Sequence, residues 1–299
     1  MAFALEPFLS AGAALAISAH ANEALQSTYL EKIYSGEWSG TMNLTESGAG
    51  SDLGPMKTRA EREGDHYRIY GQKIYITWGD HDATDNIIHL VLARLPDAPE
   101  GSRGISLFLV PKFTVNEDGS LGERNDAYPV SVEHKLGIHG SPTCVMAYGD
   151  NGGAIGYLVG EENQGLACMF TMMNELRVGV GMGAAATALA GYKAALAYAR
   201  DRPQGRHPGA DPAAPMVPIV DHADVRRMLL ACRAYAEGGV ALSLYGAALI
   251  DEINNSAGGG ASDARAVLDV LIPLIKAWPS EWGLEANRLA IQVHGGAGY

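Results

Sequence analysis

The chain has 299 residues, of which 47% are hydrophobic and 19% are charged, and its formal net charge is −12. This length predicts about two packing units with a sizeable core. The acidic balance argues against a nucleic-acid partner, because binding to a phosphate backbone requires a basic face. No run of about 18 apolar residues is present, so no membrane span is predicted.

Three cysteines, Cys144, Cys168 and Cys232, lie far apart and form no CxxC pair. This spacing favours neither a zinc ribbon nor a redox dithiol, and an odd number argues against a disulfide framework. The apolar stretch near the N-terminus has no basic residues before it, so no signal peptide is predicted. A reducing, cytoplasmic location is therefore expected.

Residues 1–40 have a helical pattern. Ser10 is predicted to cap a helix that runs through residues 11–19, and Asn22 to cap a second one that Gly36 ends. Forty residues are too few to form a hydrophobic core alone, and this segment is therefore expected to pack on the rest of the chain.

Residues 41–160 change to strand-like patterns. Tyr67–Tyr70 and Lys73–Thr77 flank the dipeptide Gly71-Gln72, which predicts a hairpin. Ile87–Ala93 is a nearly continuous apolar run, which predicts a strand buried on both faces. Because strands and helices do not alternate, a doubly wound sheet is not expected.

From Gly165 onward the pattern is helical, and small glycines such as Gly181 and Gly191 would permit close helix packing. Long helices joined by loops predict a bundle. The predicted elements are a helix over Leu166–Arg202, a loop over Pro203–Pro218, a helix from an N-cap at Asp221 to Ile253, a loop over Asn254–Gly260, a third helix from near Ser262 and a fourth segment over Glu281–Val293.

The segment Met42–Asp52 (MNLTESGAGSD) reads as a strand that enters a glycine-rich loop. Gly48 and Gly50 would let backbone amides approach a flavin edge or a phosphate closely. An ordinary turn of small residues is the alternative, and the segment is neither a GxGxxG fingerprint nor a P-loop.

The order of residues in LTESGAGSD resembles the TEPxAGSD signature of acyl-CoA dehydrogenases. Four further motifs resemble that family and follow in its order: KIYITWG at Lys73–Gly79, Asn174–Arg177, YARDRPQG at Tyr198–Gly205 and QVHGGAGY at Gln292–Tyr299. The segments EHKLGIHGSP and DVRRML resemble one subgroup, the larger bacterial enzymes that include 3-methylmercaptopropionyl-CoA dehydrogenase.

The resemblance implies an α+β multidomain fold. Residues 1–40 would be part of an N-terminal helical domain, residues 41–160 a middle β-barrel-like domain, and residues 161–299 an incomplete C-terminal helical bundle. It also implies FAD as cofactor, an acyl-CoA thioester as substrate, an electron-transfer flavoprotein as acceptor, and a homodimer or tetramer. The implied reaction removes the α-proton of the thioester and passes the β-hydrogen to flavin N5.

Residue roles follow from the same resemblance. The residues that would border the flavin ring are Met42, Leu44, Thr45, Tyr75 and Thr77, with Thr77 near N5. Ser51 would also contact the cofactor. The residues that would face the acyl-CoA are Ser51, Asn174 and Arg177. The residues that would contact FAD from the helical region, in part across a subunit interface, are Arg202, Gln204, His222, Gln292, Gly295 and Gly296. In isolation, each of these could be an ordinary core or surface residue.

The catalytic base is the missing part of the resemblance. In most family members the catalytic base is a glutamate beyond the GGxGY motif, and that position would lie after Tyr299. Other members carry the base at the position of Leu176, which cannot take a proton. Glu175 is a weak candidate, since one residue on a helix is about a 100° rotation, and Glu46 is expected to be structural. The chain is thus expected to be truncated at both ends, and a non-catalytic flavin or acyl-CoA binding fragment and an oxidase-like enzyme stay open as alternatives.

A metal-dependent enzyme is a further alternative, although the spacing of its candidate ligands matches no familiar ligand pattern. The candidates are His81, Asp82, Asp85, His89, His134 and His139. No GxSxG elbow is present to support a serine hydrolase. We therefore predict no metal site.

Overall fold

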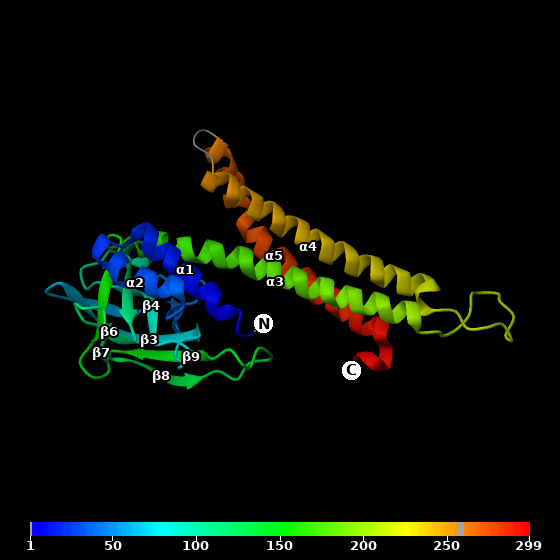
Figure 1. Cartoon of the computed structure of the whole chain (residues 1–299), viewed down its shortest axis with the longest axis horizontal. Helices are drawn as coiled ribbons and strands as arrows, with labels where there is room; N and C mark the ends of the chain where they lie inside the picture. The colour runs from blue at the N-terminus through cyan, green and yellow to red at the C-terminus, as the bar shows by residue number, and fades with distance from the viewer. Residues whose placement is uncertain (1, 256–259) are drawn as a thin grey trace. The chain divides into compact units, whose positions relative to one another are not determined.

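A computed structural model of the chain describes residues 2–255 and 260–299. The chain forms two compact units, Met1–Leu176 and Arg177–Tyr299 (Figure 1). The first unit contains two helices and all ten strands of the described chain, and the second consists of long helices. A long helix, α3, begins in the first unit and ends in the second.

Two helices open the first unit, α1 (Leu5–His20) and α2 (Glu23–Ser35). The predicted cap of α2 is confirmed, because the Asn22 side chain accepts a hydrogen bond from the Leu25 amide at 2.9 Å. Gly36 ends the helix with φ 79°, as predicted. The predicted cap at Ser10 is wrong, since α1 begins before it. The Ser10 hydroxyl instead donates to Glu6 and accepts from the Gly40 amide at 2.9 Å, which joins the helix to the sheet.

Eight strands of the first unit form one sheet that closes into a barrel, and β6 and β7 pair separately. Five of them close a ring in the order β4–β5–β10–β3–β2, because β2 pairs with both β3 and β4. β1 extends the sheet beside β4 in parallel, and β9 and β8 extend it beyond β3. A short 3-10 turn covers Gly101–Gly104. The strands are β1 (Trp38–Asn43), β2 (Arg59–Glu63), β3 (His66–Thr77), β4 (Asn86–Arg94), β5 (Ile105–Pro111), β6 (Phe113–Val115), β7 (Leu121–Arg124), β8 (Ala127–Val132), β9 (Thr143–Tyr148) and β10 (Ala154–Val159).

The predicted hairpin at Gly71-Gln72 is wrong, because β3 runs unbroken through it. Its first half pairs with β2 and β10, and its second half pairs with β9 from Gly71 onward. Gly71 serves close approach and not a turn, since a Cβ there would lie 2.6 Å from the Thr58 hydroxyl. The structure does require glycine at position 71, but the reason is a tertiary contact with Thr58 and not a turn.

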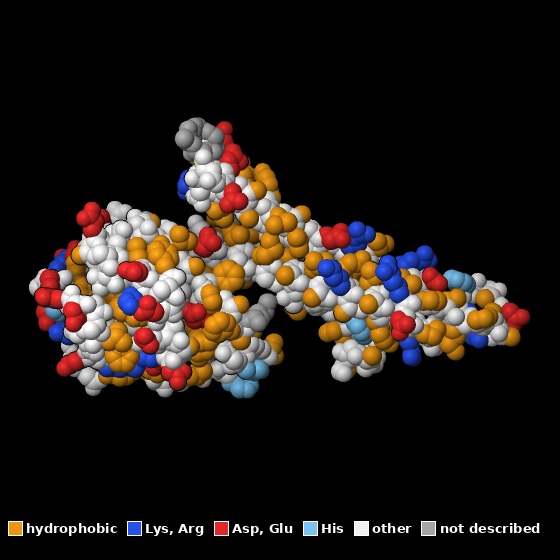
Figure 2. Space-filling model, viewed as in Figure 1, with side chains coloured by type: hydrophobic (Ala, Val, Ile, Leu, Met, Phe, Trp, Pro, Cys, Tyr) orange, Lys and Arg blue, Asp and Glu red, His pale blue; other side chains and the backbone are white. Residues whose placement is uncertain are grey.

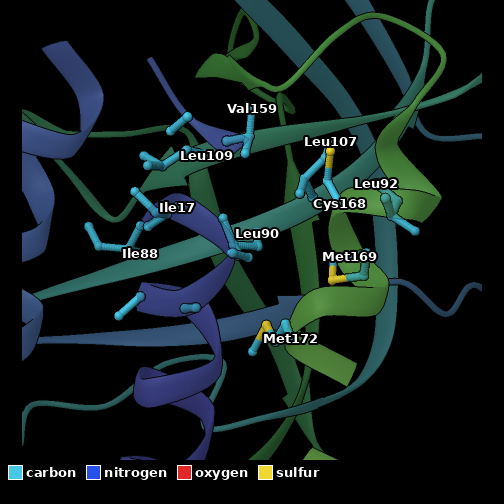
Figure 3. Packing of buried hydrophobic residues seen from close by; sticks show 14 of the residues in the cluster. Ile17, Ile88, Leu90, Leu92, Leu107, Leu109, Val159, Cys168, Met169 and Met172 are labelled. Carbon is cyan, nitrogen blue, oxygen red and sulfur yellow. The ribbon is translucent and has the colours of Figure 1, made fainter. Parts of the chain in front are cut away.

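The predicted doubly buried strand is β4, which is confirmed. Alternate side chains point to opposite faces of a strand, and both faces of β4 are covered. Leu90 joins the hydrophobic core formed with α1 and the start of α3, where Ile17 and Met172 also lie (Figure 3). Val91 joins the second core, inside the barrel.

Three helices form the second unit: the end of α3 (Gly165–Asp201), α4 (Ala223–Asn255) and α5 (Gly260–His294). Short 3-10 turns lie at Ile219–Asp221 and Gly295–Gly298. The predicted loop over Pro203–Pro218 is confirmed, whereas residues 256–259 of the loop predicted over Asn254–Gly260 lie outside the described residues. Asp221 is not an N-cap, because it ends the 3-10 turn and α4 begins after His222.

The third and fourth predicted helical segments are one continuous helix, α5, which contains Pro273 and Pro279. Proline in a helix interior costs about 3 kcal/mol. Burial of apolar side chains of α5, such as Ile275, offsets this cost. Ile275 is fully buried, and its carbonyl lies where a Cβ on Gly181 would be only 2.1 Å away. Gly191 likewise leaves room for Asn287. The prediction that these glycines permit close helix packing is confirmed.

The fold is thus α+β, with a strand barrel followed by a helical region, as the resemblance implied. Among the described residues, no helix is long and apolar enough to cross a membrane.

Candidate functional site

The segment Met42–Asp52, called the signature loop below, lies beside the end of β3 in the first unit. The Thr41 hydroxyl donates to the carbonyl of Thr77 at 2.7 Å, and the Ile74 amide donates to the carbonyl of Thr45 at 2.9 Å. Segments some thirty residues apart are therefore hydrogen-bonded neighbours. The residues predicted to border the flavin ring all lie on these two segments: Met42, Leu44, Thr45, Tyr75 and Thr77.

A buried ion pair holds the loop in place. The Lys73 ammonium is fully buried and donates to the Leu44 carbonyl at 3.0 Å and to Glu46 at 2.9 Å. The same Glu46 carboxylate accepts from the amides of Lys57 at 2.7 Å and Thr58 at 3.0 Å. Because four hydrogen bonds join three segments of the chain at these two side chains, the backbone at Leu44–Glu46 is held in place.

Burial and mutual attraction shift the pKa values of both members of this ion pair. Burial lowers the pKa of the Lys73 ammonium to about 8, although Glu46 opposes that shift. Burial by itself raises the pKa of Glu46, but the Lys73 charge and the N–H donors outweigh it, and the pKa of Glu46 lies below its usual value. Both groups are therefore charged at neutral pH. The expectation that Glu46 serves structure fits this geometry.

Tyr75 stands out from the strand beside this anchor. It has φ 62°, a conformation that costs a non-glycine residue of order 1 kcal/mol or more. It lies at an irregularity in the β3–β9 pairing between Lys73 and Ile76, and its side chain is 62% exposed. A strained backbone that presents an aromatic ring outward suits a wall for a flat ligand.

The glycines of the signature loop face open space. A Cβ on Gly48 or Gly50 would meet no atom within 4 Å, and neither residue has a positive φ. Folding of the chain therefore does not require glycine at either position, which leaves room for an external group to approach the backbone. Ser51, the predicted acyl-CoA contact, is exposed next to them.

In the second unit, the loop between α3 and α4 gathers the predicted Arg202, Gln204 and His222. The Arg202 carbonyl accepts from the Ile219 amide at 2.9 Å, and the Gln204 carbonyl lies 2.6 Å from Nε2 of His222. Arg202 and Gln204 are exposed and His222 is partly buried, so the arginine can reach an anion.

The end of α5 lies at the same end of the second unit. The His294 ring stacks on Tyr198, with ring centroids 4.8 Å apart, and Tyr198 is one helical turn before Arg202. Gln292 is exposed, and a Cβ on Gly295 or Gly296 would meet nothing within 4 Å. The two groups of residues that were predicted to hold FAD from the helical region are therefore close in this unit.

The candidate substrate and base residues lie on one turn of α3. Asn174, Glu175 and Arg177 are all partly buried. Leu176 packs on the hydrophobic core of the first unit. The proposed roles of Asn174, Glu175 and Arg177 toward the acyl-CoA stay predictions. Arg177 is the first residue of the second unit.

The candidate metal ligands do not come together in one cluster, although the rings of His134 and His139 lie 5.8 Å apart. His89 is buried beside the Tyr148 ring, and burial lowers its pKa to about 3. His81 lies against Trp78 and contacts the Ser39 hydroxyl at 3.1 Å. The remaining candidates, Asp82, Asp85, His134 and His139, lie in loops. Within residues 2–255 and 260–299, no group of three or more His, Cys, Asp or Glu side chains could hold a metal ion.

Two supporting residues are not apparent from the sequence patterns. Lys73 belongs to the KIYITWG motif, but its burial depends on tertiary contacts. Asn43 is buried and accepts from the Tyr148 hydroxyl at 2.7 Å, which ties the end of β1 to β9. A lysine within the alternating pattern of a strand is the sequence signal that could have indicated the burial of Lys73.

Family comparisons agree with this geometry. The model of the acyl-CoA dehydrogenase middle domain matches residues 41–150, and that of the acyl-CoA dehydrogenase C-terminal domain matches residues 163–299. The fold and the loop define a protein of the acyl-CoA dehydrogenase architecture. The chain belongs to the acyl-CoA dehydrogenase family.

Individual relatives support the subgroup as well. The chain is 48% identical over 300 residues to 3-methylmercaptopropionyl-CoA dehydrogenase of Ruegeria pomeroyi, covering 100% of this chain and 50% of that protein. It is 43% identical over 300 residues to butyryl-CoA dehydrogenase of Syntrophomonas wolfei, covering 97% and 49%. The crystal structure of Caenorhabditis elegans ACDH-11 in complex with C11-CoA shares the fold, with a TM-score of 0.81, 22% identity, and coverage of 99% of this chain and 48% of that chain. The chain thus spans about half the length of the curated relatives it matches.

Proposed function

We propose that this chain forms part of the active site of an FAD-dependent acyl-CoA dehydrogenase that desaturates an acyl-CoA thioester between its α and β carbons. The observation that supports it most is the signature loop in the first unit. Its backbone is anchored by Glu46 and Lys73, next to the exposed and strained Tyr75. Membership of the family gives the chemistry that such a surface would serve.

The residues present fit FAD. Gly48 and Gly50 leave the space that a ring or phosphate would fill, and Tyr75 offers a flat wall. When bound, FAD would accept the β-hydrogen as hydride. Thr45 would supply a hydroxyl group to the polar edge of the ring, and Thr77 would lie near N5. The buried ion pair would keep the backbone at Thr45 in place. Arg202 and Gln204 would bind the pyrophosphate, with Gln292, Gly295 and Gly296 beside the adenosine, in our proposal from a neighbouring subunit.

The substrate side rests on fewer observations. Ser51, Asn174 and Arg177 would orient the thioester, and Glu175 is the candidate for removing the α-proton. An electron-transfer flavoprotein is the proposed acceptor, a homodimer or tetramer the proposed assembly, and the cytoplasm the proposed location. The division into residues 1–40, 41–160 and 161–299 is proposed on the same basis.

Titration with FAD tests the cofactor. Gly48→Val is expected to lower FAD affinity by roughly tenfold or more, about 1.4 kcal/mol, because its side chain occupies the space of the ligand. Gly137→Val is the matched control, since that loop glycine also faces open space and has no positive φ. Failure of the wild-type chain to bind FAD, or equal affinity in both variants, would contradict the proposal.

Turnover is tested separately, by dye reduction with straight-chain acyl-CoA substrates. Glu175→Gln is expected to abolish any turnover while FAD binding is unchanged, because an amide cannot take the α-proton. FAD binding without turnover in the wild-type chain would reduce the proposal to a binding role. Unchanged turnover in the variant would exclude Glu175 as the base.

A further inference from the structure

The turn that follows β3 contains a strained bulky residue. Trp78 comes directly after Thr77, the last residue of the strand, and has φ 54°. A large aromatic residue in the left-handed region costs on the order of 1 kcal/mol or more, and such strain persists only where neighbouring contacts impose it. Tyr75, with φ 62°, lies three residues earlier. Two strained residues therefore bracket the short segment that carries Thr77, and contacts from elsewhere in the first unit must hold it.

Backbone contacts hold the start of this turn. The Trp78 amide donates to the Pro142 carbonyl at 2.7 Å, just before β9 begins. The Thr77 carbonyl accepts from the Thr41 hydroxyl of β1. Both hydrogen bonds act where the strand ends, so a further contact is needed to fix the far end of the turn.

Asp80 provides that contact. Its carboxylate lies 2.5 Å from the Lys112 ammonium and 3.3 Å from the Arg124 guanidinium. Lys112 directly follows β5 and also donates to the His81 carbonyl at 2.6 Å. Burial by itself raises the pKa of Asp80, but the charges of Lys112 and Arg124 outweigh it, and the pKa lies below its usual value. Asp80 is therefore charged at neutral pH and joins the turn to two other segments.

This cluster differs by its burial from the charges at the surface of the first unit. Figure 2 shows acidic and basic side chains on that surface. The side chains of Asp80, Lys112 and Arg124 are instead only 18%, 11% and 29% exposed. Charges that are largely removed from water interact more strongly than exposed ones, and loss of one partner leaves the others uncompensated. Such a cluster is strong enough to hold a strained turn.

We propose that Asp80 is a positioning residue for the flavin site, a role that rests on the proposed FAD-dependent function. Its ion pairs with Lys112 and Arg124 hold the strained turn, and the turn fixes the place of Thr77 at the end of β3. Because Thr77 would lie near N5, a small displacement of its backbone changes the surroundings of the flavin ring.

Amide hydrogen exchange of the chain without FAD tests the anchor. Asp80→Asn removes the charge but keeps the shape of the side chain, and it should speed exchange of the Trp78 amide by roughly tenfold or more, because the hydrogen bond to Pro142 opens more often. Glu63→Gln is the matched control, since Glu63 forms an exposed ion pair with Arg68 at 3.0 Å in the same unit. Unchanged exchange at Trp78, or an equal rise along all of β3, would overturn the anchor.

A second variant tests the pairing itself. Lys112→Met removes the partner of Asp80 and should also speed exchange of the Trp78 amide. The free-energy change of the combined variant should be smaller than the sum of the single changes, because both break one interaction. Far-ultraviolet circular dichroism checks that each variant is folded. Strict additivity would show that the two residues act independently and would overturn the anchoring pair.

Visible circular dichroism of bound FAD tests the role toward the cofactor. At saturating FAD, Asp80→Asn should change the flavin spectrum because Thr77 is displaced, whereas Glu63→Gln should leave it as in the wild-type chain. An unchanged spectrum in Asp80→Asn would overturn the positioning role, whatever the exchange at Trp78. A wild-type chain that binds no FAD would contradict the proposed function and the role of Asp80 toward FAD with it, while the exchange measurement would still show whether Asp80 holds the turn.

Discussion

The two units of the chain solve the packing problem in opposite ways. The first unit fills its barrel with large side chains and places an ion pair, Lys73 and Glu46, in its interior. The second unit brings long helices together through glycines such as Gly181, and leaves apolar side chains such as Leu230 exposed. The first unit therefore fixes a local geometry by buried polar contacts, whereas the second depends on the close approach of helix backbones.

The largest expected effect tests the ion pair of the first unit. Lys73→Met should lower the free energy of unfolding by about 3–5 kcal/mol, because it leaves the Glu46 charge buried without its partner. Lys32→Met is the control, since Lys32 and Glu37 form an exposed pair whose loss should change the stability little. Urea unfolding measures both. Adding Glu46→Gln to Lys73→Met should cost less than the sum of the single changes, and strict additivity would show that the pair does not act as a unit.

The next effect tests the helix contact of the second unit. Gly181→Val should lower the stability of this unit by about 3 kcal/mol, since its Cβ would meet the Ile275 carbonyl and overpacking strains a core. Ala190→Val, at an exposed position of the same helix, isolates the intrinsic cost of valine. Thermal unfolding followed by circular dichroism compares them, and equal losses would mean that the helices are not in close contact there.

The pH dependence of stability should reside in the first unit. Burial lowers the pKa of His89 to about 3, so between pH 6.5 and 3 the unfolded chain binds a proton that the folded chain does not. This contribution is complete above pH 6.5 and decreases as the pH falls, by about 2 kcal/mol at pH 5. His89→Phe should remove that loss between pH 7 and pH 5 in urea unfolding. His207→Phe, at an exposed site, should keep it, and a pH dependence that is the same in both variants would contradict the assignment.

The smallest effect concerns a helix end. Asn22→Ala should lower the stability of the first unit by about 1 kcal/mol, because the Leu25 amide loses its acceptor. Asn22→Asp should be nearly neutral, because aspartate caps equally well. A loss with aspartate as large as with alanine would show that the amide group, and not the cap, matters.

Local signals in the sequence were reliable where one residue decides the structure. Asn22 and Gly36 bound α2 because capping and a left-handed φ are properties of single residues. The apolar run of β4 and the order of the motifs predicted a buried strand and the family correctly. Short-range rules failed where a distant contact had the larger free energy. Gly71 looked like a turn because Thr58, the residue that it accommodates, is far away in the sequence.

The sequence by itself determined the family and the α+β class, and it predicted the residues of the proposed flavin site. Only the tertiary structure showed that Lys73 lies beneath the signature loop, that Tyr75 is strained and exposed, and that α5 continues through two prolines. The physical reason is the same in each case. A motif records which residues are present, whereas burial, strain and pairing depend on neighbours that folding brings from elsewhere in the chain.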